Sequence, residues 1–154
     1  MTAKPTVRVQ REDFSVEKES GELTAGRRDV GAMVAFVGLA RDENGRLAAL
    51  ELEHYGPMAE DEMRRIAEQA VARWPLTGLT VIHRHGKLVP GDRIVLVVAA
   101  SPHRDAAFAA ASFLMDYLKT SAPFWKKEYP AAGGSGQWVA AKSDDDKAIA
   151  RWKS

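Results

Sequence analysis

The chain has 154 residues, which is enough for one domain with a substantial hydrophobic core. Hydrophobic residues make up 45% of it and charged residues 28%, as in globular rather than disordered proteins. The net charge of +1 gives no general attraction to nucleic acid or membrane, so any basic site must be local. Because the chain has no cysteine, disulfides, thiolate metal sites and cysteine nucleophiles are excluded, and any sulfur it handles must arrive on a substrate or partner.

No segment has the apolar length of a signal peptide or a membrane span. We therefore expect a soluble, cytoplasmic protein that is a single domain over residues 1–154. Flexible ends are expected at 1–5 and 153–154, and a mobile loop at 130–136.

The first third of the chain has the patterns of short strands and one short helix. Residues 7–10 suit a strand, and Ser15 suits the N-cap of a short helix. Residues 31–39 form an apolar run that begins at a glycine, which predicts a largely buried strand. Residues 41–46 contain Asn-Gly and predict a hairpin turn into a second strand at 47–55.

A helix and two strands are expected next. Apolar residues recur at helical spacing over 58–74, and Pro75 ends that pattern. Residues 79–85 predict a strand and 89–92 a turn. Residues 93–100 are nearly all apolar, as in a central strand that is covered on both faces.

A long helix follows, with Ser101 as its cap and Pro102 at its first position. Its expected buried stripe consists of Phe108, Ala111, Leu114, Met115 and Leu118, and Pro123 is expected to stop it.

The C-terminal part predicts two short strands at 125–129 and 137–140, joined by a flexible Gly-Gly-Ser-Gly at 133–136. Acidic residues at 144–146 favour the start of a last helix, where the helix dipole stabilises negative charge. Hairpins mixed with three or four helices indicate an α+β fold with an antiparallel or mixed sheet.

His103 and Arg104 are the first candidate site residues. They lie in the first turn of the long helix, where free backbone N–H groups and the helix dipole already favour an anion. The dipole disfavours cations there on stability grounds, so an anion site is the preferred interpretation and solvated surface residues are the alternative.

Lys119 lies 15 residues after Arg104, which corresponds to roughly 22 Å along one straight helix. The two side chains therefore cannot reach the same small ligand within one subunit. Either they serve separate sites, or a homodimer builds composite sites from both ends of the helix.

Lys119, Lys126 and Lys127 flank an apolar turn that contains Phe124 and Trp125. Partial desolvation beside these rings would lower the lysine pKa values and suit a general acid, general base or nucleophile. The alternative is that the lysine stems merely cover the rings.

Arg41 and three histidines complete the candidates. Arg41 follows a strand that can direct it at a ligand, although a solvated hairpin arginine is equally compatible. His54, His83 and His85 lie on strands, but no motif with metal-ligand spacing accompanies them, so ordinary strand histidines are favoured over zinc.

Several segments in order resemble the large, catalytic subunit of molybdopterin synthase over about residues 7–152. They are FVGLAR (36–41), LELEHY (50–55), RWPL (73–76), VIHRHG (81–86), PGD (90–92), SPHR (101–104) and MDYLKTSAPFWKKE (115–128). The last segment, with its two spaced lysines, is the most specific.

The resemblance implies an α/β hammerhead fold and a sulfurtransferase that converts cyclic pyranopterin monophosphate to molybdopterin in molybdenum cofactor biosynthesis. It implies no cofactor or metal. The sulfur would arrive as a thiocarboxylate on the C-terminal Gly-Gly tail of a small ubiquitin-like partner subunit. The family forms a homodimer of large subunits within a heterotetramer.

Carried over by motif, the resemblance implies that Lys119 and Lys126 are catalytic. It implies substrate-binding roles for Arg41 and for His103 and Arg104 of the neighbouring subunit. The other implied substrate-binding residues are Phe36, Leu39, Ala40, Met115, Lys127, Glu128 and Lys142. Many relatives carry arginine where Lys142 stands, and lysine keeps the charge but loses the bidentate geometry.

Two rival interpretations remain at this stage. One is a non-catalytic anion- or nucleic-acid-binding module that uses the basic patch at 119–127, which a steep salt dependence would reveal. The other is an inactive scaffold subunit, although every basic position of the motifs is present.

Overall fold

The computed structural model describes residues 3–54, 56–120, 124–139 and 148–153. Its strands form two four-stranded sheets, with orders β1-β4-β6-β2 and β5-β3-β7-β8. The elements are β1 (Thr6–Gln10), α1 (Val16–Thr24), β2 (Ala32–Leu39), β3 (Leu47–His54), α2 (Met58–Arg73), β4 (Gly78–Arg84), β5 (Gly86–Leu88), β6 (Arg93–Ser101), α3 (Arg104–Thr120), β7 (Phe124–Pro130) and β8 (Gln137–Val139).

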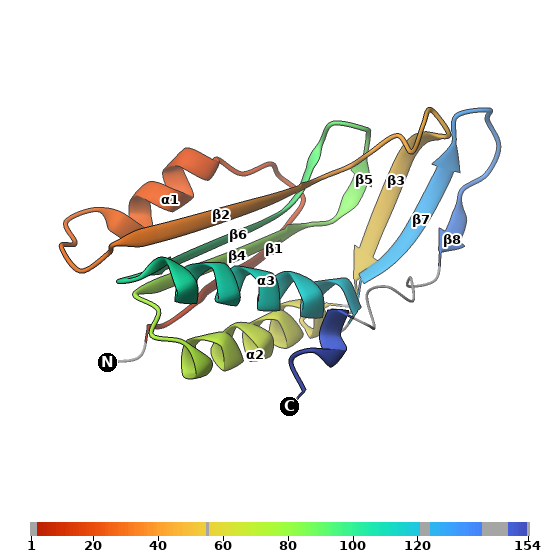
Figure 1. Cartoon of the computed structure of the whole chain (residues 1–154). Helices are drawn as coiled ribbons and strands as arrows, with labels where there is room; N and C mark the ends of the chain where they lie inside the picture. Colours follow the sequence, from red (N-terminus) through yellow and green to blue (C-terminus); the bar gives the residue numbers. More distant parts are fainter. Residues whose placement is uncertain (1–2, 55, 121–123, 140–147, 154) are drawn as a thin grey trace.

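The first sheet is covered by helices on both faces (Figure 1). Strand β1 is parallel to β4, whereas β4–β6 and β6–β2 are antiparallel pairs. Helices α2 and α3 lie on one face and contact each other, while α1 lies on the opposite face. The sequence predicted β6 to be a central, doubly covered strand, and this is confirmed because five consecutive residues from Leu96 to Ala100 are fully buried.

The main hydrophobic core lies between the first sheet and helices α2 and α3. Met63 and Ile66 of α2 and Phe113 and Leu114 of α3 are fully buried there. The helical spacing of α2 therefore predicted its buried face correctly. The C-terminal residues extend this core, since the indole N–H of Trp152 donates to Asp116 of α3 at 2.5 Å.

A smaller core under α1 joins Phe14 to Ile82, Leu96 and Val98. Helix α1 begins as predicted, because the Ser15 hydroxyl accepts a hydrogen bond from the Lys18 backbone N–H at 3.1 Å.

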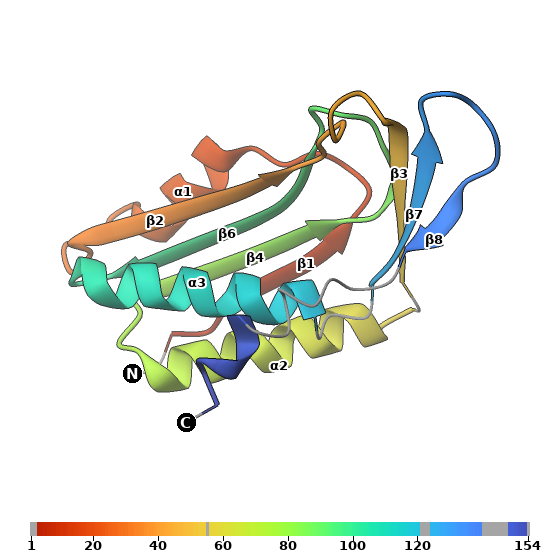
Figure 2. The same cartoon turned by 45° about the vertical axis from the view of Figure 1, so that its right-hand side comes forward.

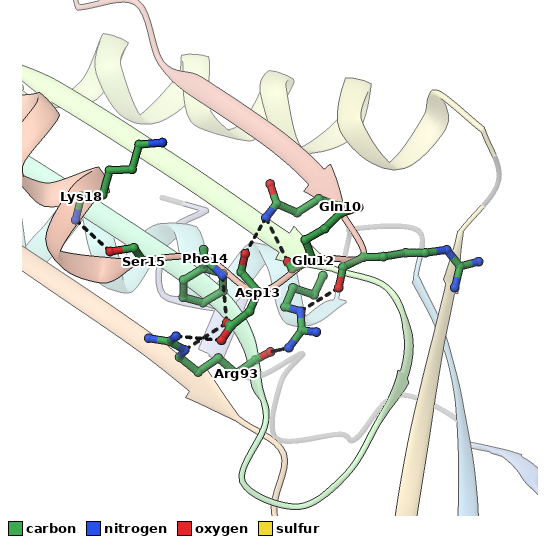
Figure 3. Close-up of polar contacts among 9 residues, drawn as sticks. Gln10, Glu12, Asp13, Phe14, Ser15, Lys18 and Arg93 are labelled. Atoms are coloured by element: carbon green, nitrogen blue, oxygen red, sulfur yellow. Dashed lines mark hydrogen bonds and ion pairs between the residues drawn. The ribbon is translucent and has the colours of Figure 1, made fainter.

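A polar cluster fixes the segment between β1 and α1 (Figure 3). Arg93, the first residue of β6, donates two hydrogen bonds to the Asp13 carboxylate at 3.0 and 2.7 Å. Asp13 also accepts from the Phe14 backbone N–H at 2.8 Å. The Arg93 guanidinium lowers the pKa of the Asp13 carboxyl below its usual value.

The second sheet runs across the end of the first one (Figure 2). Its strand β3 pairs with β5 and β7, whereas β2 pairs with β6 in the other sheet. The predicted hairpin between 31–39 and 47–55 is therefore wrong. The 41–46 segment does turn, with left-handed φ values at Glu43, Asn44 and Gly45, but it carries the chain from one sheet to the other.

Two predictions of burial are also wrong. Strand β2 is an edge strand, and Met33, Phe36 and Leu39 are 41%, 40% and 56% exposed. On α3, Phe108 is 61% exposed although it was expected in the buried stripe. The helix instead buries Phe113, which the stripe omitted. Apolar periodicity does not distinguish a core from a surface that another chain covers.

Helix α3 begins later than the sequence suggested. Ser101 is the last residue of β6, and the helix starts at Arg104, so Pro102 precedes it. The Ser101 hydroxyl accepts from the His103 backbone N–H at 3.0 Å, so it stabilises the turn that precedes the helix instead of capping the helix itself.

The C-terminal strand pair was predicted correctly, with β7 antiparallel to β8. Three predictions concern positions outside the described residues. They are the end of the long helix at Pro123, the start of a last helix at 144–146 and the end of the strand at 47–55. Among the helices that the structure describes, none has the length and hydropathy needed to span a membrane.

Candidate active site

The candidate residues divide between the two ends of the first sheet. Strand β2 begins where β6 ends, because Ala32 pairs with Ser101, and it ends where β6 begins, because Leu39 pairs with Arg93. Helix α3 follows β6 and runs back along the sheet (Figure 1). His103 and Arg104 therefore lie at one end of the sheet, whereas Lys119 lies at the other end together with Arg41.

His103 and Arg104 line a shallow pocket at the start of α3. Gly31, Ala32 and Pro102 form its other walls, together with Asp105. Gly31 is held there because its N–H donates to the Ser101 carbonyl at 3.0 Å. Both basic side chains are exposed. The N-terminal dipole of a 17-residue helix and two basic groups suit an anion that enters from outside.

At the opposite end, Lys119 lies in the last turn of α3 and is exposed. Its neighbour Leu118 belongs to the main core, against which Phe124 of β7 also packs. The Phe124 ring stacks on His83 with centroids 3.8 Å apart and an interplanar angle of 16°. The end of α3 and the start of β7 therefore meet over the end of β4.

Lys126 follows Phe124 by one pleat and lies on the same face of β7. That face is the inner one, because Lys126 is paired with Leu52, which is buried with Leu50. The Lys126 ammonium lies 3.6 Å from a carboxylate oxygen of Glu128, and the side chain of Lys126 is 33% exposed. Lys126 and Glu128 thus form one partly buried pair.

Lys127 lies on the opposite face of β7. Its cross-strand neighbours are Glu51 of β3 and Trp138 of β8. Its ammonium lies 5.4 Å from the centre of the Trp138 ring and 5.7 Å from that of the Tyr129 ring. The Tyr129 hydroxyl donates to Glu51 at 2.7 Å, and this hydrogen bond raises the pKa of Tyr129 and lowers that of Glu51. The strand alternation therefore separates Lys127 from Lys126.

The segment that carries Arg41 is fixed by its buried neighbour. Ala40 is 5% exposed and packs with Leu50 and Leu52. Its N–H donates to the Asp92 carbonyl and its own carbonyl accepts from the Gly91 N–H, both at 2.8 Å. Because Leu52 is the cross-strand neighbour of Lys126, these contacts place exposed Arg41 near the Lys126 face.

The remaining predicted residues are not all at this end. Met115 is half-buried against the main core, one turn before Lys119. Phe36 lies in the middle of β2, opposite Val97, and Leu39 projects from the last position of β2. Lys142 lies outside the described residues.

His54 of β3, His83 of β4 and His85, which lies between β4 and β5, do come together. The rings of His54 and His85 are 4.4 Å apart, and His54 lies 6.1 Å from the Phe124 ring that stacks on His83. Among the described residues, however, no group of three histidine, aspartate or glutamate side chains is arranged to hold a metal ion.

Sequence reasoning missed the contact of His83 with Phe124, two residues before Lys126. Burial, together with the charges of His85, Lys119 and His54, lowers the pKa of His83 to about 4, although a hydrogen bond to the Arg84 carbonyl acts in the opposite direction. The available signal was a histidine at the end of an apolar strand, but nothing local indicated that Phe124 would stack on it.

Fold and site together define the class: an α/β hammerhead protein whose cationic site residues are divided between the two ends of one helix. A family model described as "MoaE protein" matches residues 9–121. The chain belongs to this MoaE family.

Similar proteins and solved structures support the same assignment. A protein of Mesorhizobium japonicum named "Molybdopterin synthase catalytic subunit" is 67% identical over 150 residues, which cover 97% of this chain and 94% of the relative. The structure of the "Molybdopterin biosynthesis MoaE protein" of Burkholderia ambifaria is 46% identical with a TM-score of 0.82, covering 96% of this chain and 97% of that one. A structure of "Molybdopterin Synthase" from Staphylococcus aureus is 31% identical with a TM-score of 0.77, covering 86% and 95%.

Proposed function

We propose that this chain is the catalytic subunit of molybdopterin synthase, a sulfurtransferase of molybdenum cofactor biosynthesis. The observation that carries the proposal is its similarity over nearly its full length to relatives that bear this name. Its substrate is cyclic pyranopterin monophosphate, to which two sulfur atoms are added to give the dithiolene of molybdopterin. The rival of a non-catalytic binding module has no counterpart among these relatives.

The sulfur donor is a small ubiquitin-like subunit with a C-terminal Gly-Gly thiocarboxylate. A chain without cysteine cannot carry the sulfur itself, so a partner must deliver it. A glycine tail is narrow enough to pass between side chains and to bring its terminal sulfur to the lysines. We infer that the reaction takes place in the cytoplasm.

Two chains form the enzyme's central homodimer, with one small subunit for each. The exposed apolar residues Met33 and Phe36 of the edge strand β2, and Phe108 of α3, suit such an interface. The dimer also resolves the separation along α3, because His103 and Arg104 of one subunit meet the Lys119 end of the other. Each active site is then built from both chains.

In each site, the thiocarboxylate sulfur forms a C–S bond to a carbon of the substrate side chain as an oxygen group leaves that carbon with a proton. Water then cleaves the acyl–sulfur bond, so that the sulfur stays on the substrate and the tail returns as a carboxylate. Lys119 and Lys126 move the protons of these steps and stabilise the negative charge. Arg41 and the neighbouring subunit's copies of His103 and Arg104 bind the anionic cyclic phosphate. The other residues assigned to substrate binding by this proposal are Phe36, Leu39, Ala40, Met115, Lys127, Glu128 and Lys142.

The test is reconstitution with a thiocarboxylated small subunit and cyclic pyranopterin monophosphate, followed by assay of molybdopterin. The wild-type chain should form molybdopterin, whereas Lys119→Ala should form essentially none and remain folded. Lys18→Ala is the matched control, because Lys18 is an exposed lysine on α1, on the other face of the first sheet. Near-normal product formation by Lys119→Ala would refute the assignment.

A further inference from the structure

His83 lies where the two lysine-bearing elements meet. It belongs to the face of β4 that also carries Leu79 and Val81, which α2 and α3 cover. It is only 8% exposed. A titratable side chain in that position requires an explanation, because a hydrophobic residue would fill the same space without the cost of burying two ring nitrogens.

The hydrogen bonding fixes the tautomer of this ring. His83 Nδ1 lies 2.8 Å from the Arg84 backbone carbonyl oxygen. Since a carbonyl oxygen only accepts, Nδ1 carries the proton and donates it, and Nε2 keeps its lone pair. The ring is therefore held in one orientation by a backbone contact within its own strand.

One face of that fixed ring contacts β7. Phe124 is stacked on it at 3.8 Å, and the next inward-facing residue of β7 is Lys126. The charge of Lys119 at the end of α3 also acts on the ring. His83 thus interacts with the strand that carries one lysine and with the helix end that carries the other.

The surroundings favour an uncharged imidazole at this point. Lys119 approaches from α3, His54 from β3, and His85 follows β4, and all three disfavour a proton on His83. No acidic side chain is among the groups that influence His83 most. A charged ring would therefore repel the ammonium group that the reaction uses.

We propose that His83 is a positioning residue of the active site: its neutral ring, fixed by the Arg84 carbonyl and stacked on Phe124, sets the placement of Lys126 relative to Lys119. The effect on kcat rests on the proposed function. The position and protonation of the His83 ring do not depend on catalysis and can be measured on the chain alone.

The structural test is nitrogen NMR of the histidine rings in the unliganded protein. We expect His83 to show a protonated Nδ1 and an unprotonated Nε2 at pH 7, and to remain largely neutral at pH 5. Lys119→Met should raise the pKa of His83 above about 4, whereas Lys18→Met on α1 should leave it unchanged. A protonated Nε2, or equal effects of the two lysine substitutions, would overturn the inference.

The kinetic test compares two substitutions of the same residue in the reconstituted enzyme. His83→Ala removes the stacking surface, so kcat should fall by roughly one to two orders of magnitude with KM for the pterin substrate little changed. His83→Phe keeps a ring against Phe124 but loses the hydrogen bond to the Arg84 carbonyl, so it should recover most, but not all, of the kcat that His83→Ala loses. Val81→Ala is the matched control, since it removes buried volume two residues earlier on the same face.

Each outcome is decisive. If His83→Ala loses no more kcat than Val81→Ala at equal folded fraction, or if His83→Phe is as impaired as His83→Ala, the positioning role is wrong. If the wild-type chain forms no molybdopterin while the NMR results hold, the proposed function fails and the His83–Lys119 interaction stands.

Discussion

Lys126 and Lys127 are adjacent in sequence, but they lie on opposite faces of β7 and have different surroundings. Lys126 faces inward beside Glu128, while Lys127 lies over Tyr129 and Trp138. We expect Lys126→Ala to lower kcat by roughly 10²–10⁴-fold, the range typical of a lost acid–base group. Lys127→Ala should lower kcat much less.

The measurement is steady-state formation of molybdopterin by both variants in parallel. Circular dichroism serves as the folding control, because Lys127 also packs on two rings of the second sheet. Equal losses of kcat in the two variants would contradict the separation by strand faces.

His83 also predicts how stability depends on pH. Its pKa is about 4 in the folded chain against an ordinary value of 6.5, so the unfolded chain binds the proton more readily. The contribution of neutral His83 to the free energy of unfolding is therefore complete above about pH 6.5 and is lost as the pH falls toward 4. The loss between these two pH values corresponds to about 3 kcal/mol.

Urea unfolding at pH 7, 6, 5 and 4 measures this effect. The wild-type free energy of unfolding should fall more steeply over this range than that of His83→Phe, in which carboxylates still titrate but this imidazole is absent. Parallel curves for the two proteins would show that His83 is not buried in its neutral form.

At the scale of elements, the close contact between the start of β2 and the segment before α3 is sensitive to volume. A Cβ added at Gly31 would lie 2.1 Å from the Pro102 carbonyl oxygen, so the backbone must move. Gly31→Ala should lower the free energy of unfolding by about 1–3 kcal/mol. It should also weaken substrate binding, because Gly31 lines the same pocket as His103 and Arg104.

Gly21→Ala is the matched control for this change. Gly21 lies inside helix α1, and an added Cβ there meets no atom within 4 Å. It should therefore stabilise the chain by about 0.5–1 kcal/mol through helix propensity. Thermal melts of both variants check the prediction, and a stable, fully active Gly31→Ala would contradict it.

Local patterns predicted most elements but not their pairing. Apolar periodicity identified α2, and the unbroken apolar run identified β6 as the central strand. The Asn-Gly turn after β2 suggested a hairpin, yet the chain passes to another sheet, because pairing depends on contacts distant in sequence. Short β5 was missed, since a three-residue strand carries almost no pattern.

The site was predictable to a similar degree. Helix length alone separated Arg104 from Lys119, and the structure keeps them at opposite ends of α3. The burial of Phe108 was predicted wrongly, because a residue that suits a subunit interface has the same apolar signature as a core residue. The roles of the individual site residues and the flexible segments stay predictions.

For the whole molecule, a composite active site predicts complementation between inactive chains. Lys119→Ala and Arg104→Ala each remove one half of every site in their own homodimers. A mixed dimer contains one site with both halves intact and one with both removed. Random exchange of the two variants should therefore restore roughly a quarter of wild-type activity, because half of the dimers are mixed.

The measurement is molybdopterin formation after the two variants are co-expressed and purified as dimers. Co-expression of Lys119→Ala with Lys126→Ala is the control, since both residues belong to the same half-site and a mixed dimer gains no intact site. Restored activity in the control, or none in the test pair, would contradict the composite site.

Helix α3 spans Arg104–Thr120 and carries the proposed site residues Arg104 and Lys119 at its two ends, so its number of turns sets the distance between them. Inserting a single residue in its middle would shift one extremity by about 1.5 Å and rotate it by roughly 100° relative to the other. Such a change can leave the fold intact yet misalign both catalytic centres of a symmetric pair. The length of α3 is therefore constrained by the positions of the groups at its two ends as well as by the stability of the fold.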